Sequence, residues 1–92
     1  MAPREDQRFT LSADVVSRVL DGDAVLLDLA SGKYLGLNAV ATRVWELLGQ
    51  GQAFGAIRAG LLTEFEVPAA VLDGDLDQLF ADLQERALIR PA

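Results

Sequence analysis

The stretch "VLLDLASGKYLGLNAVATRVWELL", residues 25–48, decides the fold, because the period of its apolar residues changes at Asn38. Before Asn38 the alternation is that of strands, which we predict over residues 24–30 and 34–37 with a turn at 31–33. After Asn38 the apolar residues recur at helical spacing, and the Asn38 side chain can accept a hydrogen bond from an early helical N–H. The stretch therefore predicts a hairpin that runs directly into a helix, with Gly49 as a residue that ends it.

Working outward, side chains alternate between two faces in two short segments of residues 9–20, on either side of "SAD" at 12–14. This pattern predicts one bent or bulged strand. The first eight residues are polar and charged, and we expect a flexible tail followed by a single domain over residues 9–92. On the other side, apolar stripes predict a second helix from Phe54 and a third from Pro68 to near Ala87, followed by a short tail. Three strands followed by three helices predict an α+β fold, and the helix–turn–helix pattern beside a small antiparallel sheet is that of a winged helix-turn-helix.

Composition restricts the chemistry that this chain can support. The 92 residues contain neither cysteine nor histidine, which removes thiolates, imidazoles and the usual zinc ligands. The hydroxyls have no histidine base, and the glycines form no phosphate loop, so we expect no catalysis and no cofactor or metal. The first twenty residues have no apolar signal segment and no run reaches bilayer length, so we expect a cytoplasmic protein without a membrane partner.

Acidic residues crowd the predicted third helix, at Asp73, Asp75, Asp77, Asp82 and Glu85. An acid–base pair or a cation site is one interpretation, but "DGDLDQ" departs from a calcium loop because Gln78 stands where the loop requires glycine. A solvated helix face is favoured instead. A winged helix-turn-helix that regulates transcription is the alternative function, yet five acids against one base would repel phosphate, as would a net charge of −6. We therefore expect no nucleic-acid partner.

An exposed strand edge is a common binding site for an extended peptide, because it presents unpaired N–H and C=O groups. The short strand "YLGL" is the candidate edge, and its Gly36 adds no side chain to a core. Without a Cβ, Gly36 would let another backbone or a bulky ligand side chain come close. The competing interpretation is that Gly36 relieves crowding where the strand turns into the helix.

Several motifs in this order resemble the PqqD-like RiPP recognition elements, and among them the discrete small B proteins of lasso-peptide biosynthesis. The motifs are a strand ending in Asp28, the turn Gly32-Lys33-Tyr34, the pair Leu37-Asn38, and Trp45 to Leu48 in the first helix. The third helix adds Asp75-Leu76 near its start and "ALI" at 87–89, where the family usually has glycine first. The resemblance covers residues 9–89. The departure at Ala87 leaves open how the third helix ends.

The resemblance implies a winged helix-turn-helix that captures the leader segment of a ribosomally made precursor peptide. In the family, the leader adds as an antiparallel strand to the third strand and lies against the third helix. Leader-binding residues carried over to this chain are Lys33, Tyr34, Leu35, Gly36, Leu37, Asp75, Leu79, Asp82 and Leu83. Tyr34 and Leu35 point to opposite faces of a strand, so we expect one of them in the leader cleft and the other in the core.

The third helix divides into two stripes. We assign Asp75, Leu79 and Asp82 to the leader, with the two carboxylates attracting a Lys or Arg, and the adjacent stripe that includes Leu83 mainly to the core. Trp45 is expected in the core rather than at the peptide. The resemblance also implies a partner enzyme, most directly a leader peptidase, with a radical SAM enzyme served by a PqqD-type chaperone as the alternative. A monomer or weak dimer is expected, since an open sheet edge can pair between copies.

Overall fold

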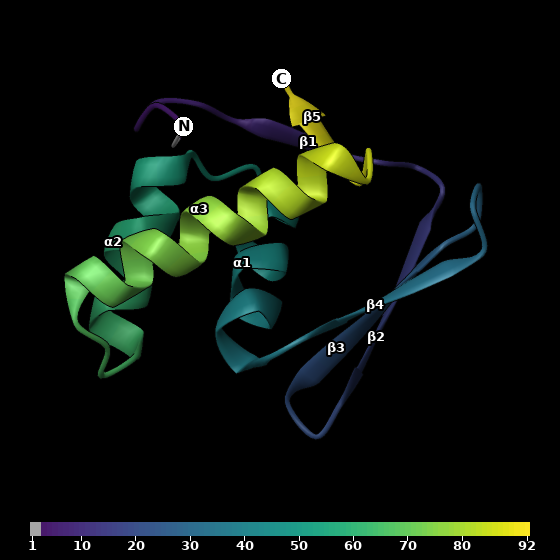
Figure 1. The fold of residues 1–92 in the computed structure, drawn as a ribbon. Coiled ribbons are helices and arrows are strands. Elements are labelled where there is room, and N and C mark those ends of the chain that lie inside the picture. The colour runs from purple at the N-terminus through teal and green to yellow at the C-terminus, as the bar shows by residue number, and fades with distance from the viewer. Residues whose placement is uncertain (1–2) are drawn as a thin grey trace.

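The computed structural model describes residues 3–92 and arranges them as an α+β fold (Figure 1). A three-stranded antiparallel meander extends from one side of three packed helices, and a small two-stranded sheet lies beside the end of the third helix, where the chain ends. The described elements are β1 (Phe9–Leu11), β2 (Val15–Leu20), β3 (Asp23–Asp28), β4 (Lys33–Leu37), α1 (Ala39–Gly49), α2 (Phe54–Glu64), α3 (Ala69–Glu85) and β5 (Ile89–Pro91). Within residues 3–92, no helix is long and apolar enough to cross a membrane.

The predicted hairpin and its neighbour form the meander in the order β2-β3-β4, which confirms three antiparallel strands followed by three helices. The single bent strand predicted over residues 9–20 is wrong. Ser12 donates its backbone N–H to the Leu88 carbonyl at 2.9 Å, and the chain then turns, so β1 and β2 belong to different sheets. β1 pairs with β5, which forms from residues that we expected in a short C-terminal tail.

Both ends of α1 have side-chain or backbone caps. The Asn38 side chain accepts a hydrogen bond from the Ala41 N–H at 2.9 Å, as predicted. At the other end the left-handed residue is Gly51, at φ +79°, rather than Gly49, which is still helical. Gly51 and Gln52 donate their N–H groups to Leu48 and Leu47, the pair of bonds that defines a Schellman motif.

The third helix ends in the same way, with alanine in place of glycine. Ala87 has φ +56°, its N–H bonds to the Gln84 carbonyl at 3.0 Å, and the Leu88 N–H bonds to the Leu83 carbonyl at 2.9 Å. The helix therefore stops at Glu85 despite the departure from glycine. At its start, Pro68 is the residue before the first helical turn and not the first helical position that we predicted.

The core lies between the helices and the inner face of the meander. Phe80 of α3 is its centre, with edge-to-face contacts to Phe9 at 5.2 Å and Phe54 at 5.0 Å between ring centroids. Trp45 is only 9 % exposed, which confirms it as a core residue. Because α3 packs through Leu72, Leu76, Phe80 and Leu83, one side of this helix is fixed and the opposite sides are free for other contacts.

The N-terminal segment lies against the helices before β1 begins. Phe54 and Gly55, at the start of α2, donate their N–H groups to the carbonyls of Gln7 and Glu5, each at 2.8 Å. A Cβ on Gly55 would stand 3.1 Å from the Glu5 carbonyl oxygen, so glycine permits this approach. The tail predicted over residues 1–8 thus includes residues bound to the helical layer, while Met1 and Ala2 lie outside the described residues.

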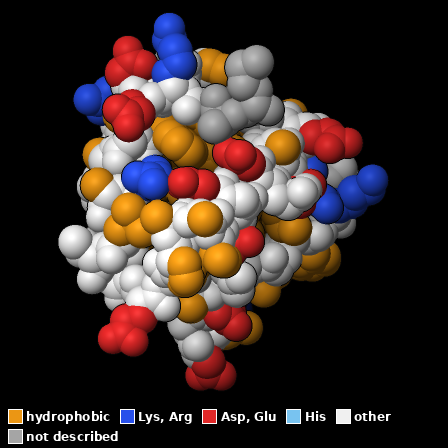
Figure 2. Space-filling view, turned by 60° about the vertical axis from the view of Figure 1, so that its left-hand side comes forward, with side chains coloured by type: hydrophobic (Ala, Val, Ile, Leu, Met, Phe, Trp, Pro, Cys, Tyr) orange, Lys and Arg blue, Asp and Glu red, His pale blue; other side chains and the backbone are white. Residues whose placement is uncertain are grey.

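Two ion pairs connect neighbouring helices. Arg43 of α1 holds Glu64 of α2 through Nε at 2.9 Å and Nη2 at 3.0 Å, and Arg58 of α2 pairs with Asp73 of α3. Hydrogen bonds from these guanidinium groups hold the pKa of Glu64 and of Asp73 below their ordinary values. On the face that Figure 2 shows, acidic side chains are scattered among hydrophobic and basic ones rather than gathered into one charged field.

Candidate functional site

The site begins at β4, which is the last strand of the meander and has β3 as its only partner within it. In a paired strand the N–H and C=O groups of alternate residues point to opposite edges, so one edge of β4 presents unpaired backbone groups. The prediction that this strand lies at the sheet edge is confirmed. Such an edge is a template for one more strand.

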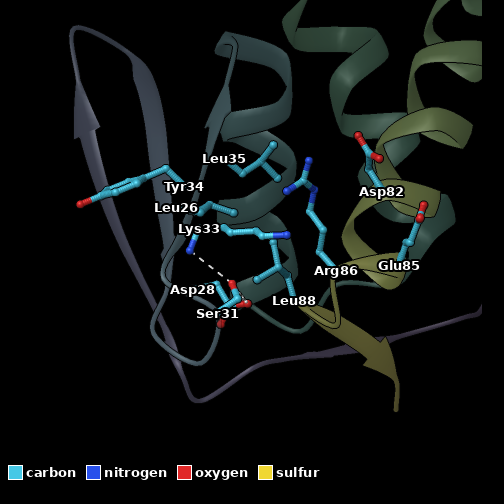
Figure 3. Close-up of a pocket in the computed structure, with 10 residues that line it drawn as sticks. All are labelled: Leu26, Asp28, Ser31, Lys33, Tyr34, Leu35, Asp82, Glu85, Arg86 and Leu88. Carbon is cyan, nitrogen blue, oxygen red and sulfur yellow. Dashed lines mark hydrogen bonds between the residues drawn. The ribbon is translucent and has the colours of Figure 1, made fainter.

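A groove runs along this edge, between β4 and α3. It consists of two adjoining pockets of about 370 and 310 Å³, which share Leu35 and Asp82. We call the two together the β4–α3 groove. The larger part lies toward the start of β4 and is lined by Leu26, Asp28, Ser31, Lys33, Tyr34, Leu35, Asp82, Glu85, Arg86 and Leu88 (Figure 3). The smaller part lies toward α1 and is lined by Leu35, Gly36, Leu37, Asn38, Val40, Ala41, Asp75, Leu76, Gln78, Leu79 and Asp82.

Alternation along β4 decides which side chains face the groove. Leu35 shares the inner face with Leu37, is half-buried against the core, and lines both parts of the groove. Tyr34 points to the opposite face, where it is 69 % exposed (Figure 3). Leu35 is therefore the residue in the cleft, and the expectation that the other of the pair enters the core is wrong. Leu37 is the strand residue whose side chain is buried, at 5 % exposure.

Three of the four predicted residues of α3 line the groove. Asp75, Leu79 and Asp82 lie along its helical wall, and Leu79 is half-buried there. Leu83 is 1 % exposed and lines neither part of the groove, so its assignment to the peptide site is corrected: it is a core residue. The physical reason is that Leu83 follows Phe80 by three positions and shares its inward face.

The groove also contains one charged residue that the sequence did not single out as a leader contact, Arg86, beside the predicted Lys33 and the motif residue Asp28. Arg86 extends from the end of α3 into the larger part of the groove, and Lys33 points to the same side of the sheet (Figure 3). The Asp28 carboxylate is already engaged within the turn, since it accepts hydrogen bonds from the Ser31 hydroxyl and the Ala30 N–H. The spacing of four residues between Asp82 and Arg86 was the only signal for Arg86 in the sequence.

A buried hydroxyl fixes the sheet to the helix that follows it. The Thr42 Oγ1 of α1 accepts a hydrogen bond from the Ala24 N–H of β3 at 2.8 Å and donates to the Leu37 carbonyl at 3.3 Å. Thr42 is 3 % exposed, so these bonds are shielded from water. The contact holds β3 and the end of β4 at a set distance from α1, which positions the groove.

The chemistry available in the groove is that of recognition. It offers backbone donors and acceptors along β4, an apolar floor and wall at Leu35 and Leu79, and charges of both signs at the rims. Across residues 3–92, no three acidic side chains lie together in an arrangement that would hold a metal ion. An extended polypeptide is the ligand class that uses all of these features together.

Comparison with known proteins agrees with this geometry. The chain has a TM-score of 0.78 and 34 % identity to the solved structure of TbiB1 in complex with the TbiA(beta) leader peptide, covering 87 % of this chain and 93 % of that one. A lasso peptide synthetase B1 complexed with the leader peptide has the same TM-score at 28 % identity, with 91 % and 99 % covered. No curated protein matches the chain. Residues 23–89 match the family of coenzyme PQQ synthesis protein D (PqqD), and the chain belongs to that family.

Proposed function

We propose that this protein binds the leader segment of a ribosomally made precursor peptide, which adds as an antiparallel strand to β4 and lies against α3. The observation that carries the proposal is the open edge of β4 beside the β4–α3 groove, in a chain 34 % identical to TbiB1, whose structure contains a leader peptide. Strand addition satisfies backbone groups that the sheet leaves unpaired, and the groove receives alternate side chains of the added strand.

The groove can supply useful affinity. About four backbone hydrogen bonds at a net of about 1 kcal/mol each, with two apolar anchors at about 1.5 to 3 kcal/mol each, give about 7 to 10 kcal/mol. Ordering a flexible peptide opposes this by about 2 to 5 kcal/mol. The balance corresponds to weak to micromolar binding, so affinity depends on the side chains that pack against Leu35 and Leu79.

The carboxylates of α3 add a charge preference at the helical wall. Asp75 and Asp82 line the groove, and the described residues place no Lys or Arg within ion-pair distance of either. A Lys or Arg of the leader would pair with them, at about 0.2 to 1 kcal/mol for an exposed pair. The same acidic wall would repel the phosphates of nucleic acid, so we expect no band shift with duplex DNA at low salt.

Presentation to a separate enzyme completes the proposed role. In this role the protein delivers the leader to a separate processing enzyme, for which a lasso-peptide leader peptidase is our first candidate. Similarity to a lasso peptide synthetase B1 supports a partner from lasso-peptide biosynthesis over a radical SAM partner. Pull-down of the protein with each candidate enzyme, in the presence and absence of leader, distinguishes the two partners.

Fluorescence polarisation tests the binding itself. A labelled synthetic leader of the cognate precursor peptide should bind saturably. Leu79→Arg places a charge in the groove and should weaken binding at least tenfold, or about 1.4 kcal/mol. Val71→Arg is the matched control, because Val71 is an apolar residue of the same helix, 52 % exposed and outside the groove. No saturable binding by wild type, or equal losses in both variants, would contradict the proposal.

A further inference from the structure

The outer face of the meander has a gap at its open edge. Pairing in the sheet places Arg18, Val25 and Gly36 in one row across the three strands, and Val16, Leu27 and Tyr34 in the next. These rows face away from the core, whereas Ala24, Leu26 and Leu37 face it. Every position in the two rows carries a side chain except Gly36, where a Cβ would meet no atom within 4 Å apart from those of its two chain neighbours. We call this gap the Gly36 notch.

The notch is bounded by apolar groups. Val25 lies behind it on β3 and is half-buried, and Tyr34 stands beside it on the same face of β4, with 69 % of its surface exposed. The backbone conformation at position 36 does not require glycine, since Gly36 is not among the residues with positive φ. A side chain at this position would even favour the strand. The absence of one is therefore not explained by the folded domain alone.

A strand added to β4 would continue the rows of the sheet. Its residue opposite Gly36 would project on the outer face, within the spacing of a cross-strand pair, at about 4.5 to 5.5 Å between Cβ positions. A large side chain there can lie across the glycine, and aromatic side chains stabilise strand glycines in this way. It would cover the notch and reach toward Val25, with the Tyr34 ring on its flank.

Resting on the proposed function, we infer that the Gly36 notch is a second specificity site, which takes a large apolar side chain of the bound leader on the face opposite the groove. The leader is then held from both sides of its strand. Side chains opposite Lys33, Leu35 and Leu37 enter the groove, and the one opposite Gly36 covers the notch. The sequence suggested that Gly36 admits a bulky ligand group, and its register places that group on the outer face.

Gly36→Val tests this inference. The added side chain enters open space in an extended strand, so the variant should melt no lower than wild type. It should lose at least tenfold in leader affinity, and Gly36→Ala should lose less. An alanine scan of the leader should then find one large apolar residue whose replacement by alanine makes wild type and Gly36→Val bind equally. Arg18→Val, in the same row but two strands away, is the control and should bind as wild type does.

The outcomes separate the inference from the proposed function. If wild type binds the leader and Gly36→Val binds within twofold of it, the notch has no role and the groove alone accounts for recognition. A loss that no leader substitution relieves would also overturn the notch, because the effect would then not come from a side chain opposite it. If wild type does not bind the leader, both proposals fail.

Discussion

Replacing Ala87 by glycine should stabilise the protein. Ala87 occupies the left-handed region at φ +56°, where its Cβ crowds the backbone at a cost of about 1 to 2 kcal/mol. Glycine removes that cost but loses about 0.5 to 1 kcal/mol through the greater freedom of the unfolded chain. The midpoints of these two ranges give a net gain of about 0.75 kcal/mol, which for a domain of this size raises the melting temperature by about 3 to 6 °C.

An alanine-to-glycine substitution in the interior of the helix should change the stability in the opposite direction. Ala81 is an exposed residue in the interior of α3, and Ala81→Gly should cost about 1 kcal/mol there. Thermal melts of both variants by circular dichroism give the comparison directly. If Ala87→Gly lowers the melting temperature as Ala81→Gly does, then α3 does not end in a left-handed residue. The position of Leu88 in the lining of the groove, which depends on that helix end, would then also be wrong.

Thr42→Val should cost about 1 to 3 kcal/mol in urea unfolding, because the buried Ala24 N–H would lose its acceptor, whereas Thr63→Val on the exposed side of α2 should stay within about 0.5 kcal/mol. If Thr42→Val unfolds with the same free energy as wild type, the Thr42 hydroxyl does not hold the sheet to α1 as described. Lowering the pH should reduce the free energy of unfolding of wild type more than that of Arg43→Gln. The pKa of Glu64 is lowered in the folded state by its hydrogen bonds from Arg43. The stability that this pair contributes is therefore present above the ordinary pKa near 4, and it is lost as the pH falls through the lowered pKa. Equal acid sensitivity of the two proteins, measured from pH 6 to pH 3, would contradict that pairing.

The local part of the fold could be predicted from the sequence. The change of period at Asn38 located the hairpin, the helix cap and the edge strand, because each depends on residues a few positions apart. β5 could not be predicted, since its partner β1 lies 80 residues away and neither three-residue segment has a pattern of its own. The split of the first predicted strand follows from the same distant pairing.

The site was predictable where alternation or helical spacing sufficed. Leu79, Asp75 and Asp82 fall on one stripe, and the groove contains all three. The sequence could not decide whether Tyr34 or Leu35 faces the groove. That depends on the burial of Leu37, which determines which face of the strand the alternate side chains take. Leu83 was carried over as a leader contact although its helical stripe was assigned mainly to the core, and the stripe gave the correct placement.

Hydrogen exchange of the β4 amides tests the central claim most directly. The claim is that the leader adds as a strand to the open edge of β4, and in that case saturating leader should slow exchange at alternate amides of Lys33–Leu37. The other edge of the meander, at β2, is the internal control and should exchange as before. Slowed exchange confined to β4 is the predicted result, and unchanged β4 amides with the leader bound, or protection at β2 instead, would contradict the claim.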